Sequence, residues 1–294
     1  MMINQFLNYL RYERNSSPLT VQTYEESLRE FESYLSLRDN GLSLGEVDAD
    51  LIRDWMESLM DKGHTASTIN KKLSALRSFY RFALKRKLVD KDPAHCIIGP
   101  KKSKPLPQFL REREMDNLLD KLEWDDDNYK EVRARTILLL LYETGLRRSE
   151  LVGLDDADVD FAISQLKVTG KRNKQRIVPF GTELAETLKR YKAIRDEQQA
   201  KHSDALFLDD KGKRMTGMQV YNIVRKYLTA VTSLKKRSPH VLRHTFATAM
   251  LNNGAGLESI KNLLGHESVS TTEIYTHTTF EQLKRVYKEA HPRA

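Results

Sequence analysis

Apolar residues in the first ninety positions recur at steps of three and four, which is the spacing of one face of an α-helix. We take Ser67 as the N-cap of the third helix, because a serine hydroxyl can accept from the free N–H groups of a first turn. The pattern predicts a helical bundle over residues 1–92. The three apolar stripes are Val21, Tyr24, Leu28, Phe31, Leu35; then Leu51, Trp55, Leu59; then Ile69, Leu73, Leu76, Tyr80, Ala83.

Residues 93–107 lose this periodicity and contain four prolines and three lysines. Proline lacks a backbone N–H and interrupts helices, so this composition is typical of a linker. A chain of 294 residues is also long enough for two hydrophobic cores. We therefore expect a second domain over residues 108–294.

The second domain is predicted to be mostly helical with one small β-hairpin. Residues 111–122 have helical periodicity, and residues 132–142 are almost all apolar, as in a buried helix. Strand-like residues 166–169 and 176–179 flank a turn-rich segment. Near the end of the chain, a short amphipathic helix is predicted from the spacing of Phe280, Leu283, Val286 and Tyr287.

The charge distribution of the chain favours a polyanionic partner. The net charge is +8, yet residues 1–100 hold 14 basic and 14 acidic side chains, so the excess lies after residue 100. A basic surface favours a polyanion, because each phosphate it neutralises releases condensed counterions. Within the first domain, residues 65–88 contain seven basic residues and no acidic one. We expect this helix to contact DNA through Lys71, Arg77, Arg81 and Lys85. The alternative is that these residues form an ordinary solvated helix surface.

Several other classes of protein do not fit the sequence. The longest apolar run, residues 137–142, is far below the roughly 20 residues of a membrane span, so we expect a soluble, cytoplasmic protein. The single cysteine, Cys96, has no disulfide partner and is expected to be buried. Asp125, Asp126 and Asp127 with Glu123 could suggest Mg²⁺, but consecutive carboxylates point in different directions, which favours a solvated loop. No cofactor or metal is expected.

Four separate segments carry the candidate chemistry. They are Thr-Gly-Leu-Arg-Arg-Ser-Glu-Leu at 144–151, His-Val-Leu-Arg-His at 240–244, Leu-Leu-Gly-His at 263–266, and a tyrosine nine residues later. Lys171 lies on the hairpin turn between the first two. In this order they resemble the tyrosine recombinase (phage integrase) family. Thr-Thr-Glu-Ile-Tyr-Thr-His at 271–277 is similar to the nucleophile segment of its bacterial Xer subgroup.

The resemblance implies a role for each residue. Tyr275 would be the nucleophile that forms a 3′-phosphotyrosine, and Arg147 and Arg243 would bind the non-bridging oxygens. Lys171 would donate a proton to the departing 5′ oxygen. His240 would assist proton transfer at Tyr275, and His266 would donate a hydrogen bond to the phosphate.

Three neighbouring residues leave alternatives open. Arg148 is the alternative to Arg147 as a ligand of the phosphate, and Lys174 is the alternative to Lys171 as the proton donor. Glu150 lies three residues after Arg147 on the same helix face, where it could orient that guanidinium or form a solvent-facing ion pair.

The resemblance also implies an architecture and partners. An N-terminal core-binding (SAM-like) domain and a C-terminal catalytic domain would clamp double-stranded DNA at a specific recombination site. Four protomers on two sites, alone or with a second Xer-like recombinase, would exchange strands through a Holliday junction. The phosphotyrosine conserves the bond energy, so neither ATP nor metal is implied.

The biological role would be chromosome dimer resolution at cell division, with a septal DNA translocase as a further partner. An integrase of a mobile element, a non-catalytic DNA-binding protein of this fold and a type IB-like topoisomerase are the alternatives. The C-terminal helix would dock into a neighbouring protomer, or else pack on its own domain.

Overall fold

The computed structural model describes residues 2–38, 42–102, 106–170, 173–198, 202–265 and 277–293, and the side chains of the last range from residue 282 onward. The chain divides into two compact units, Met1–Pro105 and Leu106–Ala294. Each unit has its own core, and each is described by itself. None of the described helices is long and apolar enough to cross a bilayer.

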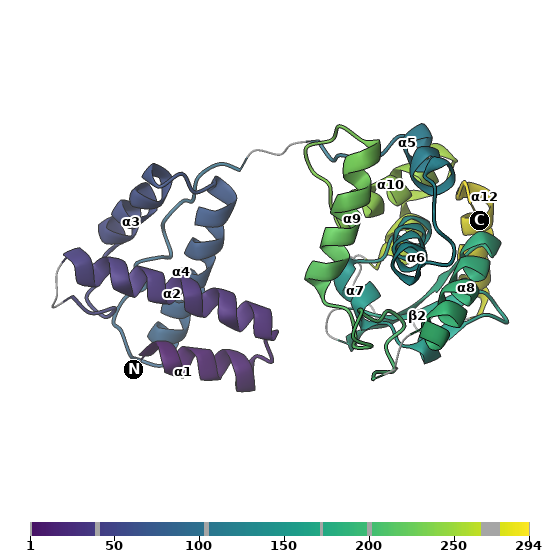
Figure 1. Ribbon diagram of the computed structural model, residues 1–294. Coiled ribbons are helices and arrows are strands. Elements are labelled where there is room, and N and C mark those ends of the chain that lie inside the picture. The colour runs from purple at the N-terminus through teal and green to yellow at the C-terminus, as the bar shows by residue number, and fades with distance from the viewer. Residues whose placement is uncertain are drawn as a thin grey trace. The chain divides into compact units, whose positions relative to one another are not determined.

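The first unit is helical (Figure 1). It contains α1 (Met2–Asn8), which continues into the π-helical η1 (Tyr9–Glu13), then α2 (Pro18–Arg38), α3 (Ala49–Asp61) and α4 (Ala66–Lys85). The predicted stripes supply its core, where Phe31, Trp55 and Tyr80 are almost fully buried. The first helix was not anticipated, although its Phe6 packs edge-on against Phe79 of α4.

Helix α4 begins two residues earlier than the sequence suggested. Its N-cap is Thr65, whose Oγ1 accepts a hydrogen bond from the Thr68 backbone N–H at 3.3 Å. Ser67 is not the cap, because it already lies inside the first turn. A cap must precede the first helical residue in order to reach N–H groups that have no helical partner.

The chain after α4 folds back onto the first unit. Ala94 and Ile97 are buried in its core, so the first residues of the expected linker pack with the helices. Cys96, between them, is exposed. The expectation of a buried thiol was therefore wrong, because the neighbouring Ala94 and Ile97 take the inward positions and Cys96 lies on the outer side of the segment.

The second unit is arranged around α6 (Tyr129–Thr144), most of whose side chains are buried. Figure 1 shows α6 among α8 (Thr182–Gln198), α9 (Gly217–Val231) and α10 (Pro239–Asn252), and all three contact it. The helix predicted over residues 111–122 consists of a short α5 (Glu112–Asp116) and a π-helical η2 (Asn117–Lys121).

The hairpin was correctly predicted and belongs to a three-stranded antiparallel sheet. Its strands are β1 (Val159–Asp160), β2 (Gln165–Thr169) and β3 (Gln175–Pro179), in that order. Leu166 pairs with Val178, and both are fully buried, which fixes the register against the core. The two-residue β1 was not anticipated. A short 3-10 helix, η3 (Asp156–Asp158), precedes it.

Three further helices complete the unit: α7 (Arg148–Gly153), α11 (Leu257–Leu264) and α12 (His277–Ala290). The C-terminal α12 packs within its own unit, where Leu283 and Tyr287 join Phe246 and Met250 in a small apolar cluster. The buried Tyr287 hydroxyl donates to Glu143 Oε2 of α6 at 3.1 Å. The predicted apolar stripe therefore has a partner in the same chain, apart from Phe280, whose side chain lies outside the described residues.

Candidate active site

Arg243 of α10 joins two of the four sequence segments. Its side chain is buried, and Nη1 donates to the Gly145 carbonyl oxygen at 2.6 Å, while Nη2 donates to the Leu264 carbonyl oxygen at 2.8 Å. Burial, followed by the positive charge of Arg147, lowers the pKa of Arg243 to about 10. The guanidinium is thus held in a fixed place and still carries its charge at neutral pH.

Gly145 adopts the left-handed conformation that this contact requires. It ends α6 with φ +59° and donates its N–H to the Leu141 carbonyl oxygen, as a helix C-cap does. A Cβ at this position would lie 2.6 Å from Phe246 Cδ1 and 2.7 Å from a Leu264 methyl carbon. Only glycine therefore fits between α10 and α11 here, which explains the Gly-Leu-Arg sequence physically.

Arg147 follows two residues later, as the N-cap of α7. Its backbone N–H donates to Glu150 Oε2 at 2.8 Å, and its Nη1 donates to Glu150 Oε1 at 2.7 Å. The Glu150 side chain is only 2 % exposed, whereas that of Arg147 is 26 % exposed. The contact is therefore internal and not a solvent-facing ion pair. It leaves part of the Arg147 guanidinium open to a ligand.

A residue that the sequence reasoning missed holds Glu150 from the other side. Arg176 of β3 donates Nη1 to Glu150 Oε1 at 3.0 Å and Nη2 to Oε2 at 2.9 Å. Burial alone would raise the pKa of Glu150, but the bonds and charge of Arg176, with the bonds from Arg147, hold that pKa below its usual value. One sign was available in the sequence: Arg176 occupies the same strand face as the buried Val178.

His240 lies in the first turn of α10, three residues before Arg243, and is exposed. Partial burial and the nearby positive charges, led by that of Arg243, lower its pKa. A neutral imidazole, which can accept a proton, is thereby favoured near pH 7. The rival cations are both exposed: Arg148 lies against Gly217 at the start of α9, and Lys174 lies in the hairpin turn.

Lys171, His266 and Tyr275 lie outside the described residues. The described residues just before Lys171 and His266 lie close to Glu150 and Arg147. Gly170, just before the lysine, comes close to Glu150, since a Cβ built there would lie 3.5 Å from Oε1. Gly265, just before the histidine, accepts from Arg147 Nη2 at 3.2 Å.

The basic residues of α4 do not all face solvent. Lys71, Arg81 and Lys85 are exposed. Arg77 is half-buried and donates to the backbone carbonyl oxygens of Ala94 and Ile97 in its own unit. In this structure Arg77 therefore anchors the returning chain, while the other three remain open to a polyanion.

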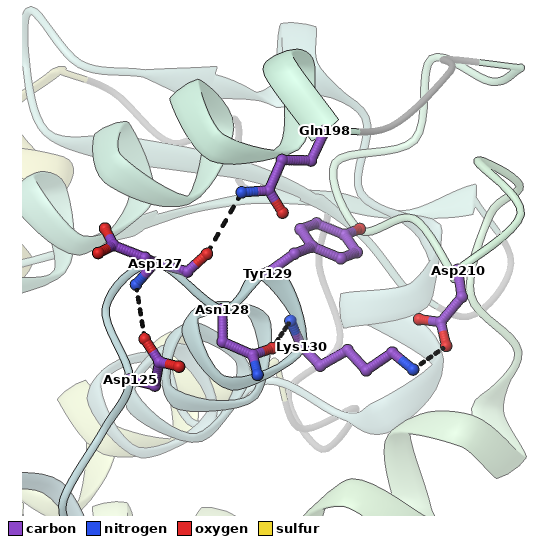
Figure 2. Close-up of a pocket in the computed structure, with 7 residues that line it drawn as sticks. All are labelled: Asp125, Asp127, Asn128, Tyr129, Lys130, Gln198 and Asp210. Carbon is purple, nitrogen blue, oxygen red and sulfur yellow. Dashed lines mark hydrogen bonds and ion pairs between the residues drawn. The ribbon is translucent and has the colours of Figure 1, made fainter.

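Asp125 and Asp127, from the acidic run that was assigned to a solvated loop, help to line a surface pocket at the start of α6 (Figure 2). Lys130 Nζ lies 3.1 Å from Asp210 Oδ2, and Gln198 donates to the Asp127 carbonyl oxygen at 3.3 Å. Asp125 Oδ1 accepts from the Asp127 N–H at 3.0 Å. Among the described residues, no group of three His, Cys, Asp or Glu side chains could hold a metal ion.

Comparison with known proteins gives the family of the chain. Residues 108–282 match the model of the phage integrase family, and residues 3–87 match that of the phage integrase N-terminal SAM-like domain. Tyrosine recombinase XerC of Chlorobaculum tepidum is 38% identical, with 99% of this chain and 94% of the relative covered. Tyrosine recombinase XerD of Staphylococcus epidermidis is 36% identical, with 100% and 99% covered.

A solved structure is similar over the same length. The XerH site-specific recombinase bound to palindromic difH substrate, in a post-cleavage complex, is 25% identical with a TM-score of 0.73, over 96% of this chain and 83% of that one. The chain therefore belongs to the phage integrase family, the tyrosine recombinases. It is a site-specific recombinase of the Xer type, an enzyme that cleaves and rejoins DNA through a tyrosine without metal or ATP.

Proposed function

We propose that Tyr275 is the nucleophile of this enzyme and that Arg147 and Arg243 bind the scissile phosphate. The tyrosine Oη attacks phosphorus, the bond to the 5′ oxygen breaks, and that oxygen takes a proton from Lys171. The 3′-phosphotyrosine keeps the energy of one phosphoester bond. A 5′-hydroxyl from the partner strand can therefore reverse the step and rejoin the DNA.

The observation that carries this proposal is the shared anchor of the two arginines. Arg243 binds the Leu264 carbonyl oxygen and Arg147 binds the next one, that of Gly265. Two guanidiniums fixed on consecutive carbonyl groups lie close enough to approach one phosphate. Donors positioned in advance around a developing negative charge are a large source of catalytic power, because they need not reorganise during the reaction.

The histidines have separate roles in this scheme. His240, neutral because its pKa is lowered, accepts the proton of the Tyr275 hydroxyl, which is mostly protonated at pH 7 with a reference pKa of about 10. His266 donates to a non-bridging oxygen. In the sequence it directly follows Gly265, whose carbonyl oxygen accepts from Arg147.

DNA binding uses both units. The exposed Lys71, Arg81 and Lys85 of α4 contact the phosphate backbone, and the catalytic unit contacts the opposite face of the duplex, as a clamp. We assign Arg77 no phosphate, because it is already bonded within the first unit.

The biological role we propose is the resolution of chromosome dimers at cell division, in the cytoplasm. Relatives named XerC and XerD support it, and so does the XerH structure with its difH substrate. Four protomers would act on two sites, with a second Xer-like recombinase and a septal DNA translocase as further partners. Integrase of a mobile element is the second candidate, since the Tn1549 transposon integrase has the same fold. In its complex with transposon right end DNA, that protein is 20% identical to this chain, with a TM-score of 0.72.

Recovery of the target site separates these roles. DNA cross-linked to the protein in its source cell would be sequenced, and the recovered sequence placed twice on a plasmid. Dimer resolution predicts one chromosomal locus and excision between its two copies. Recovery of the ends of a mobile element would favour the integrase role, and recovery of dispersed loci without excision would contradict site-specific recombination.

We also propose that α12 is exchanged between protomers in the tetramer. In the single chain it is held by the apolar cluster and by Arg293, which pairs with Asp120 and Glu183. Exchange requires these ion pairs to open. Arg293→Gln should therefore speed synapsis of two sites without changing single-site affinity, whereas Arg285→Gln, on the exposed face of α12, should change neither. Unchanged synapsis in Arg293→Gln would favour permanent packing in its own unit.

A further inference from the structure

Three arginines bind three consecutive carbonyl groups at the C-terminal end of α11. Arg176 Nε donates to the Leu263 oxygen at 2.9 Å, Arg243 Nη2 to that of Leu264 and Arg147 Nη2 to that of Gly265. The last carbonyl groups of a helix have no helical partner and carry partial negative charge, so cationic donors suit them. Two of these arginines have a role in the proposed reaction, and Arg176 has none so far.

Arg176 has little capacity left to bind a phosphate itself. Its side chain is 8 % exposed, and each of its three nitrogens already donates within the protein, Nε to Leu263 and the other two to Glu150. The planar guanidinium serves both partners at once, which a lysine ammonium cannot do with the same geometry.

Close packing keeps Arg176 in this place. A Cβ on Gly265 would lie 3.2 Å from Arg176 Cδ and 3.2 Å from Nη1, so a side chain there would press on the guanidinium. Gly265 also has φ +65°, which glycine adopts without strain. The backbone at the end of α11 therefore lies directly against Arg176.

A continuous chain of contacts leads from Arg176 to the candidate phosphate ligand. Glu150 Oε1 accepts from both Arg176 Nη1 and Arg147 Nη1, at 3.0 and 2.7 Å. Since the Glu150 side chain is 2 % exposed, no solvent can replace a lost partner without rearrangement. The carboxylate position, and with it the direction of the Arg147 guanidinium, depends on Arg176.

We propose that Arg176 is a positioning residue for DNA cleavage: it aligns Arg147 through Glu150 and fixes the end of α11 against which both phosphate-binding arginines are set. This inference rests on the proposed role of Arg147. Strand β3 would then contribute to catalysis as well as forming one strand of the hairpin.

The first test compares Arg176→Gln and Arg176→Lys with the unmodified full chain on a nicked suicide substrate of the recovered site. Affinity for the site should be unchanged. Single-turnover cleavage should fall about 100-fold in Arg176→Gln, the effect of a catalytic group misplaced by about 1 Å. Arg176→Lys should cleave at an intermediate rate, because it keeps the charge and one donor nitrogen in place of three.

A matched control separates positioning from folding. Arg133 has the same 8 % side-chain exposure and likewise binds a carbonyl oxygen, that of Leu208, and a carboxylate, that of Asp210. Arg133→Gln should also lower the melting temperature, yet cleave at the full rate under conditions where both variants are folded. Equal cleavage defects in the two variants would reduce Arg176 to a structural residue.

The second test uses a substrate in which a methylphosphonate replaces the scissile phosphate, so that one charged non-bridging oxygen becomes a methyl group. Arginine then has less charge to stabilise. The defects of Arg147→Ala and Arg176→Gln should both shrink, and the double variant should cleave no more slowly than Arg147→Ala alone, since coupled residues are not additive.

Two further results would overturn the proposal while leaving the reaction scheme intact: full-rate cleavage by Arg176→Gln, or a defect that is the same on both substrates and adds to that of Arg147→Ala. If Arg147→Ala itself cleaves the ordinary substrate at the full rate, the proposed role of Arg147 fails first. The two failures are therefore distinguishable.

Discussion

Arg243 donates a 2.6 Å hydrogen bond to the carbonyl oxygen of Gly145, which lies 98 positions earlier in the chain. The bond connects the Gly-Leu-Arg segment at the end of α6 with the His-Val-Leu-Arg-His segment of α10. It exists because Gly145 takes a left-handed conformation that points its carbonyl group toward α10. Two motifs that are distant in sequence thereby come together in the proposed phosphate-binding site.

Gly145→Ala should break this relationship. The left-handed backbone costs about 1–2 kcal/mol with a Cβ, and overpacking against Phe246 adds about 1–3 kcal/mol. Gly254→Ala is the control in the same unit, because Gly254 has φ +85° but no atom within 4 Å of the new Cβ. Thermal melting should show the larger loss for Gly145→Ala, and only this variant should lose cleavage in the folded state. Equal losses would mean that the packing does not matter.

The exposed basic residues of α4 should govern the salt dependence of DNA binding. Changing Lys71, Arg81 and Lys85 together to Gln should lower the slope of log affinity against log salt by about 0.9 for each lost phosphate contact. The matched triple is Arg29, Arg38 and Arg53, which are also exposed in the first unit but pair with carboxylates. An unchanged slope in the α4 triple, measured by salt titration, would place the DNA surface elsewhere.

The pH profile should report His240. Its folded pKa is lowered, first by burial and then by Arg243, so the neutral form persists below pH 6.5. Cleavage at limiting enzyme concentration should therefore hold its rate as pH falls through 6.5 and decline only below it. His240→Asn should be slower and lack that acid limb. An acid limb above pH 6.5, or one retained in the variant, would assign it to another group.

Stability at alkaline pH should depend on Glu143. Burial raises its pKa to about 8, well above the unfolded value, although Gly181 and Tyr287 donate to Oε2. A raised carboxyl pKa stabilises the fold at low pH and loses that contribution as pH rises toward 8, at about 1.4 kcal/mol for each pH unit between the folded and unfolded values. Glu143→Gln should therefore gain stability relative to the unmodified protein between pH 5 and 9. Urea unfolding that shows a constant difference across this range would contradict the buried, protonated carboxyl.

Local patterns predicted much of this fold. The stripes of α2, α3 and α4 and the β2–β3 hairpin were evident because helical and strand periodicities are written in neighbouring residues. The first helix, with Phe6 packed on Phe79, and the two-residue β1 carried too short a pattern to stand out.

Only the site residues that lie within sequence motifs were predicted. Arg147, Glu150 and Arg243 were identified from their segments, and the structure brings them together. Arg176 was missed because its partners, Glu150 and Leu263, are 26 and 87 positions away. The bonds of Arg77 within its own unit were not foreseen either, because the carbonyl groups that bind it come from a segment with no pattern of its own. Contacts between distant parts of the chain are decided by packing.

Covalent capture of the DNA tests directly whether Tyr275 is the nucleophile. The protein would be incubated in EDTA with a nicked suicide substrate, and the covalent complex digested and analysed by mass spectrometry. We predict one nucleotide adduct, on the peptide that contains Tyr275, and no covalent complex from Tyr275→Phe although that variant still binds the site. A complex formed by Tyr275→Phe, or one that disappears in EDTA, would contradict a metal-independent tyrosine nucleophile at this position.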